Sequence, residues 1–231
     1  MSFSIGNGTY ETSPTGEEGT WTPYTSGTEI TLEKADDKIY FRAGSDEGNE
    51  TCMESAFEIR NGKIAAYGNI QSLLDKKMER LDVPGDCYSY MFYGCTSLTQ
   101  APALPATTLA DYCYQNMFEG CTSLTKAPEL PATTLAGSCY YNMFWNCTSL
   151  TQAPELPATT LADYCYQYMF CDCTNLNDIN VNFSVWEPSN ATEDWLYGVA
   201  AEGTFTCPTA LPDTPRDTSH IPSGWTRADK Q

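Results

Sequence analysis

The hydrophobic and polar positions of this chain repeat with a period of 26 residues over about half of its length. Between residues 105–130 and 131–156, 20 of 26 positions are identical. Fixed apolar columns alternate with variable polar ones, a pattern typical of stacked structural repeats. We divide the array into four units, at residues 79–104, 105–130, 131–156 and 157–182.

Within one unit, the pattern predicts a short helix followed by a short strand. Leu109, Cys113, Met117, Phe118 and Cys121 fall near one face of a helical winding. The segment CTSLTKA then favours an extended backbone, and the two prolines of PELPATT exclude a helix and argue against a long, fully hydrogen-bonded strand. One such unit cannot bury its own apolar face, but stacked copies bury a continuous core.

Two cysteine columns and one phenylalanine column run through the array, and we expect them to line its core. Residues stacked in register point the same way, which suits buried, reduced thiols better than the geometry of a disulfide. The columns are Cys87, Cys113, Cys139 and Cys165; Cys95, Cys121, Cys147 and Cys173; and Phe92, Phe118, Phe144 and Phe170.

The segments that flank the array have different patterns. Residues 1–19 are polar and predict an extended or flexible arm. Residues 20–67 predict a small antiparallel β domain that caps the array, with Asn61-Gly62 as the signal for a tight hairpin. Residues 183–231 predict a degenerate last repeat and a C-terminal cap, in which Trp225 would cover the open end.

The repeated motif MFxGCTSLTxAPxLPATTLA resembles the BspA-like leucine-rich repeats, and the resemblance covers about residues 68–182. Repeats of this kind occur in surface proteins of gut and oral anaerobic bacteria and in the tailed phages that infect them. The resemblance implies an α+β solenoid, with a short repeat array between an N-terminal antiparallel β unit and a C-terminal capping segment. It also implies a displayed binding or structural module without catalytic activity.

The net charge of −18, from 30 acidic and 12 basic residues, limits the partners of the protein. Such a surface repels phosphate backbones and anionic lipids, so nucleic acid is a poor candidate. No apolar run approaches the roughly 18 residues of a membrane span, so we expect no membrane insertion. The first residues lack the basic and apolar segments of a signal peptide. Together with many reduced thiols, this favours a virion surface protein over an exported bacterial adhesin.

The sequence offers little for catalysis, and we expect no catalytic residues, no cofactor and no metal. His220 is the single histidine, and the nucleotide, esterase and zinc-protease motifs are missing. A small secreted hydrolase with paired carboxylates is a weaker alternative, because the acidic residues of the array are scattered. A cluster of oxygen-bearing residues resembles calcium ligands but lacks the closing bidentate glutamate. It comprises Asp172, Asn175, Asn177, Asp178 and Asn180.

The variable columns of the array are the candidate binding surface. Exposed aromatic residues among polar ones suit protein or sugar binding, although drift after duplication gives the same variation. The candidates are Tyr90, Tyr93, Lys126, Trp145 and Tyr168. The expected partners are other virion proteins or a protein or glycan on a host cell, and self-association is a further option.

Overall fold

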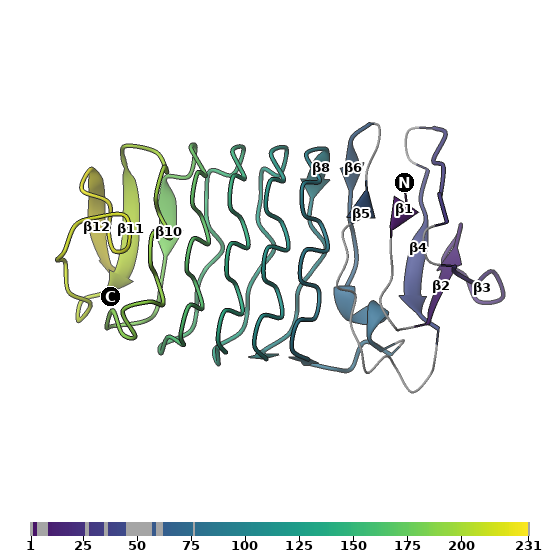
Figure 1. The fold of residues 1–231 in the computed structure, drawn as a ribbon, viewed down its shortest axis with the longest axis horizontal. Helices are drawn as coiled ribbons and strands as arrows, with labels where there is room; N and C mark the ends of the chain where they lie inside the picture. Colours follow the sequence, from purple (N-terminus) through teal and green to yellow (C-terminus); the bar gives the residue numbers. More distant parts are fainter. Residues whose placement is uncertain are drawn as a thin grey trace.

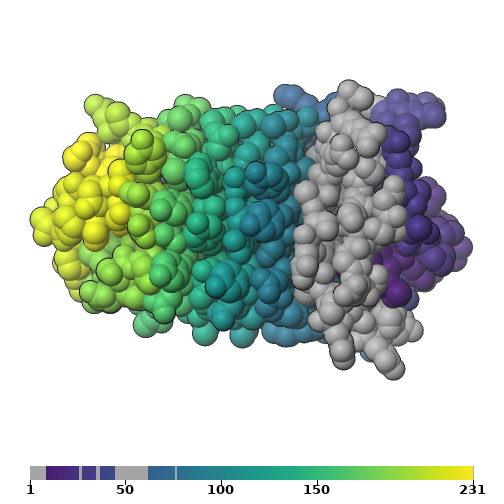
Figure 2. Space-filling view, viewed as in Figure 1, coloured from purple at the N-terminus to yellow at the C-terminus, as the bar shows by residue number. Residues whose placement is uncertain are grey.

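Successive turns of the chain stack side by side into an elongated β-solenoid, with the N-terminal segments at one end and the C-terminus at the other (Figure 1). The structure is a computed structural model that describes residues 2–3, 9–25, 28–34, 37–44, 57–58, 62–75 and 77–230. We call each turn a rung. Figure 2 shows the rungs as successive bands of colour across the molecular surface.

The rungs are joined by short parallel strand pairs. Equivalent residues 26 positions apart face each other, as Thr108 faces Thr134 and Asp178 faces Thr204. The strands of the stack are β7 (Asp82–Val83), β8 (Leu98–Gln100), β9 (Thr108–Leu109), β10 (Asp178–Asn180), β11 (Gly203–Pro208) and β12 (Trp225–Lys230). They are short inside the array, in keeping with the prolines that follow them.

The N-terminal segments form two small sheets. The strands before the array are β1 (Ser2–Phe3), β2 (Tyr10–Ser13), β3 (Thr22–Pro23), β4 (Tyr40–Ala43), β5 (Phe57–Glu58) and β6 (Ile64–Ala65). One antiparallel sheet has the order β3-β2-β4, so β2 belongs to it although it precedes the expected boundary at residue 20. That boundary and the other domain limits stay predictions.

The predicted hairpin around Asn61-Gly62 is wrong in its pairing. Asn61 lies outside the described residues, and Gly62 has a φ of +81°. However, β5 pairs with β1, and β6 pairs in parallel with β8 of the first repeat. The parallel stack therefore already includes Ile64, which the sequence placed in the antiparallel unit. Ile64 is partly buried and packs against the core of the array, which favours pairing with the array over a local hairpin.

The predicted helix in each repeat is also wrong, so the α+β label does not hold. The described residues contain one 3-10 helix, η1 (Ile70–Leu73), and no α-helix. In its place, alternate N–H groups bond to the next rung: Tyr114 N donates to Cys139 O at 3.0 Å and Phe118 N to Met143 O at 2.9 Å. The N–H groups of the residues between them form hydrogen bonds within local turns. For example, Met117 N donates to Tyr114 O at 3.2 Å.

We call this segment the turn ladder. It comprises residues 86–95, 112–121, 138–147 and 164–173 of successive rungs. An α-helix uses its N–H groups internally and cannot bond to a neighbour in this way. The ladder leaves half of its N–H groups for the next rung, so the backbone itself holds the stack together.

A positive φ at every fourth residue creates the ladder. In one rung φ is 60° at Tyr112, 56° at Asn116 and 73° at Gly120. Such left-handed residues interrupt a helix, and asparagine and glycine tolerate them best. The resulting four-residue period is close to the 3.6 residues of a helix, which is why the apolar spacing imitated one.

All twelve side chains of the predicted cysteine and phenylalanine columns are buried. The phenylalanine rings stack with centroids 5.4–5.6 Å apart. A second aromatic column, which the sequence did not indicate as core, runs beside it at 5.9 Å spacing. It consists of Tyr88, Tyr114, Tyr140 and Tyr166. Trp195 ends both columns, with its ring 6.1 Å from Tyr166 and 6.4 Å from Phe170.

The cysteine side chains fill space in the core and also form hydrogen bonds. The thiols of Cys121, Cys147 and Cys173 donate to the carbonyl oxygens of Phe92, Phe118 and Phe144 in the preceding rung, at 3.0–3.1 Å. Nine described cysteines are reduced. The expectation of eight reduced column thiols is wrong at Cys87, which is disulfide-bonded.

The C-terminal segment continues the parallel sheet through β11 and β12. Trp225 at the start of β12 is buried and donates from Nε1 to Ala200 O at 2.8 Å. A Cβ atom added at Gly203 would lie 2.7 Å from the Trp225 ring, so the ring packs directly on that backbone. The role of Trp225 as a lid stays a prediction.

Candidate binding face

The turn ladder presents one side to the core and the other to solvent. Pairs of residues alternate: Met117 and Phe118 are buried, whereas the next two residues, Glu119 and Gly120, are partly exposed. The same order recurs at residues 91–94 and 143–146, whereas in the fourth rung Cys171 is buried and only Asp172 is partly exposed. We call the solvent side the outer face of the turn ladder. It is rigid because every rung is bonded to its neighbours through the backbone.

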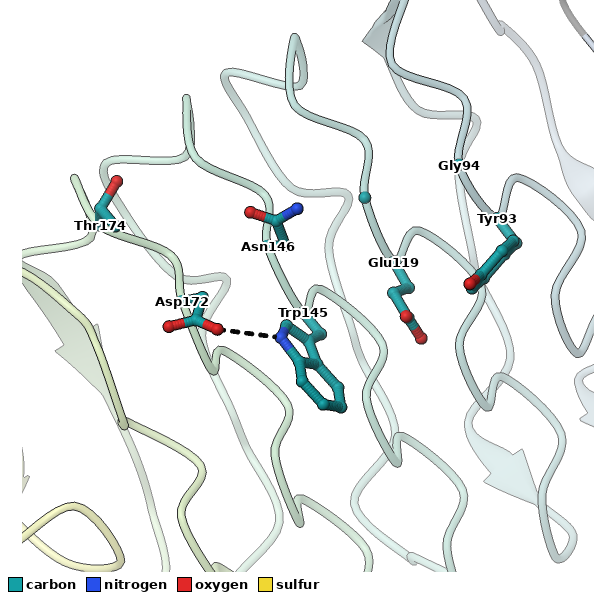
Figure 3. A pocket seen from close by; sticks show the side chains of 8 residues that line it. Tyr93, Gly94, Glu119, Trp145, Asn146, Asp172 and Thr174 are labelled. Atoms are coloured by element: carbon teal, nitrogen blue, oxygen red, sulfur yellow. Dashed lines mark hydrogen bonds between the residues drawn. The ribbon is translucent and has the colours of Figure 1, made fainter.

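A groove of about 590 Å³ crosses four rungs of this outer face. Its lining consists of Tyr93, Gly94, Glu119, Gly120, Trp145, Asn146, Asp172 and Thr174. Figure 3 shows the side chains of Tyr93, Glu119, Trp145 and Asp172 following one another on consecutive turns. Two aromatic rings therefore alternate with two carboxyl groups, and we call this the outer groove.

Trp145 is held by two residues of the next rung. Its Nε1 donates to Oδ2 of Asp172 in the next rung at 3.2 Å (Figure 3). Its ring lies 5.9 Å from that of Tyr168, which in turn meets Tyr141 edge to face at 5.9 Å. These contacts fix the indole in place, so a ligand would meet a ring that is already ordered.

Glu119 is only half exposed and is positioned by a buried amide. Nδ2 of Asn116 donates to Oε2 of Glu119. Burial raises the pKa of Glu119, and this effect outweighs the hydrogen bond from Asn116, which lowers it. Glu119 is therefore a partly buried, positioned carboxyl group rather than a freely exposed one.

Four of the five predicted binding residues lie on the outer face. Tyr93 and Trp145 line the groove, Tyr168 touches Trp145, and the ring of Tyr90 is 5.8 Å from that of Tyr93. Lys126 is exposed but occupies the rung position of Gln100 in β8, so it belongs to the strand side of the rung. Binding by any of these residues stays a prediction.

The sequence did not indicate Asp172 and Tyr141 as members of this face. Asp172 follows a cysteine that occupies the variable aromatic position, and Tyr141 precedes Asn142 in a column that otherwise holds Ser89, Gln115 and Gln167. The left-handed positions are the signal that could have found them, because they mark where the outer side of each turn begins.

The other candidate chemistry is dispersed. Within the described residues, no group of three or more histidine, cysteine, aspartate or glutamate side chains lies close enough to hold a metal ion. Asp178 accepts from Gln152, and Asn175 donates to the Thr148 carbonyl, so the calcium-like residues have other partners. His220 bonds to Asp217 at 2.7 Å and packs against Trp186.

No helix in the described part of the chain has the length and apolar character of a membrane span. A model of one protein family matches residues 85–191, in six copies, and its description is "BspA type Leucine rich repeat region". No curated protein and no solved structure gave a match. The matched residues include the whole turn ladder from Asp86 to Cys173 and thus the lining of the outer groove.

Proposed function

Residues 85–191 form a BspA-type leucine rich repeat region, and we propose that the protein is a displayed binding module that works without catalysis through the outer face of its turn ladder. Repeat solenoids typically bind partners through an extended surface rather than a reaction pocket. The observation that carries the proposal is the outer groove, in which Tyr93 and Trp145 are displayed on a backbone bonded from rung to rung.

We assign the module to the surface of a phage particle, as a decoration, fibre or attachment protein. Seven of the eight column thiols are reduced and buried, which suits a chain that folds in a reducing cytoplasm before release. Its partners would be other virion proteins or a protein or glycan on the host cell. Many copies on one particle would raise a weak single-site affinity by avidity.

One observation favours a bacterial cell-surface adhesin as the second candidate. The disulfide at Cys87 is typical of a protein that matures in an oxidising compartment. The buried thiols are compatible with this as well, because burial raises the pKa of Cys113 to about 12 and so keeps the reactive thiolate form rare.

The test compares phage particles that carry or lack this protein, for assembly and for adsorption to host cells. On the virion proposal the protein copurifies with particles, and its removal reduces adsorption or assembly. Trp145→Ala should weaken adsorption, because aromatic anchors carry much of the binding energy at such surfaces. The matched control is Tyr67→Ala, which removes an exposed ring away from the ladder.

If the protein were absent from purified particles and displayed on a bacterial surface, the adhesin proposal would replace the virion proposal. Equal effects of the two alanine variants would overturn the outer face as the binding surface. Circular dichroism and thermal melts establish that both variants keep the fold.

A further inference from the structure

The outer groove has a chemical character that specifies its ligand more narrowly than a general binding face. Its lining holds two carboxyl groups, Glu119 and Asp172, and two aromatic rings, Tyr93 and Trp145, but no lysine or arginine. Within the described residues, neither carboxyl group takes part in an ion pair. The negative charge of the groove is therefore not neutralised by the protein itself.

Each carboxyl group keeps acceptor positions for a ligand. Glu119 accepts a hydrogen bond from Asn116, and Asp172 accepts hydrogen bonds from Trp145 and from the thiol of Cys171. An ionised carboxylate offers about four lone-pair positions, so each carboxyl group keeps acceptor capacity for a ligand. These internal bonds orient the carboxyl groups without satisfying them.

Two amide side chains lie buried in the turns that carry Glu119 and Trp145. Oδ1 of Asn116 and Oδ1 of Asn142 have no hydrogen-bond partner, and the two residues are 4% and 6% exposed. Neither residue lines the groove, so its chemical character comes from the two carboxyl groups and the two rings.

We propose that the outer groove binds a cationic side chain, the guanidinium or ammonium group of a basic segment in a protein partner. The carboxylates supply charge-assisted acceptors, and the faces of Tyr93 and Trp145 supply cation–π contacts. The net charge of −18 steers such a segment towards the protein. The inference rests on the proposed function, since it names the ligand class of the same face.

A defined peptide tests the inference directly. The probe is acetyl-Arg-Gly-Arg-amide, titrated by isothermal calorimetry at low salt and again at high salt, with acetyl-Gln-Gly-Gln-amide as the neutral counterpart. We expect binding of the arginine peptide that weakens with salt and much weaker binding of the glutamine peptide. Chitotriose is the third probe, because neutral sugars also stack on aromatic rings.

Paired variants separate the groove from the overall charge of the protein. The double variant Glu119→Gln and Asp172→Asn removes both groove carboxylates, and asparagine tolerates the φ of 59° at position 172. The control, Glu129→Gln with Asp163→Asn, changes two exposed carboxyl groups elsewhere and gives the same net charge. We expect the groove variant to weaken binding of the arginine peptide about tenfold and the control less than about twofold.

Trp145→Leu and Trp145→Phe supply a second measurement. Trp145→Leu should weaken binding of the arginine peptide. Trp145→Phe keeps a ring face and should retain most of the affinity. Equal losses in the groove and control double variants would mean non-specific attraction and would overturn the inference. Tighter binding of chitotriose than of the arginine peptide would overturn it too, yet would leave the proposed binding face standing. If the arginine peptide binds as expected but removal of the protein changes neither the assembly nor the adsorption of phage particles, the proposed function alone would be overturned.

Discussion

The thiol of Cys147 donates a hydrogen bond to the backbone carbonyl of Phe118 in the preceding rung, with 3.1 Å between Sγ and oxygen. The same carbonyl accepts the N–H of Cys121 at 3.0 Å. One cysteine column thus bonds neighbouring rungs through its side chains. This explains why a residue that combines small volume with a donor recurs at that position.

We predict that Cys147→Ala is more destabilising than Cys113→Ala. Both side chains are fully buried, but the bond from the Cys113 thiol to the carbonyl oxygen of Cys139 is long, at 3.9 Å, and therefore weaker. The lost hydrogen bond should add about 0.5–1 kcal/mol to the cost of the cavity that both variants share. Urea denaturation of the two variants measures the difference, and equal losses would show that the sulfur only fills space.

The repeat and the composition of its core could be predicted from the sequence, because identical residues at a fixed period must occupy equivalent places. The turn ladder could not, since a four-residue period of apolar positions is too close to that of a helix. The buried tyrosine column was missed because tyrosine, which carries a polar hydroxyl group, is also common on protein surfaces. Tyr114, for example, is 1% exposed although its hydroxyl lacks a hydrogen-bond partner.

The candidate site was predicted only in part, and for a related reason. Variation within a column pointed to Tyr93 and Trp145. The contact of Trp145 with Asp172, however, joins residues 27 apart that become neighbours only when the rungs stack. Likewise, Cys87 occupies the same column as Cys113, so its position in the repeat gave no sign that it is disulfide-bonded.

The reactivity of the thiols provides a second prediction. Alkylation of the native protein should modify few cysteines, because the nine reduced ones are buried. In denaturant without reductant those nine should react, and reductant should raise the number further because it releases the disulfide-bonded Cys87. Intact-mass measurement gives the count. A number near zero in denaturant would mean that the columns are bridged.

We also predict that the protein loses stability at alkaline pH. Burial raises the pKa of Cys113 and of Cys165 to about 12. In the unfolded chain a thiol ionises near pH 8.5, so above that pH the unfolded state binds fewer protons than the folded state. The stabilising contribution of each thiol is complete below about pH 8 and is lost between about pH 8.5 and 12.

The slope should reach about 1.4 kcal/mol per pH unit for each such thiol. Urea denaturation at pH 8, 9.5 and 10.5 measures it. Replacing Cys113 and Cys165 by alanine should flatten the dependence, because two of the titrating groups are then gone. A free energy of unfolding that stays constant up to pH 10.5 would contradict the burial of these columns.

A fourth prediction concerns the backbone of the turn ladder. Gly120→Ala should cost about 1 kcal/mol, because the φ of 73° is strained for a residue with a Cβ atom. Space is not the obstacle, since the added atom would lie 3.5 Å from the Cα of Gly94. Gly85→Ala is the control, at a position without a positive φ, and should be neutral or stabilising. If thermal melts ranked the two in the opposite order, the left-handed positions would not define the ladder.

The last prediction separates the two sides of one turn. Phe118 is fully buried between Phe92 and Phe144, with ring centroids 5.4 and 5.6 Å away. Phe118→Ala should therefore destabilise the protein by about 3–5 kcal/mol, since the stack cannot close around the missing ring. Glu119→Gln, on the next residue, should change the free energy of unfolding by less than about 1 kcal/mol, because glutamine can still accept the hydrogen bond from Asn116. Denaturation of both variants measures the contrast. A larger loss from Glu119→Gln than from Phe118→Ala would reverse the inner and outer sides of the ladder, and with them the placement of the groove.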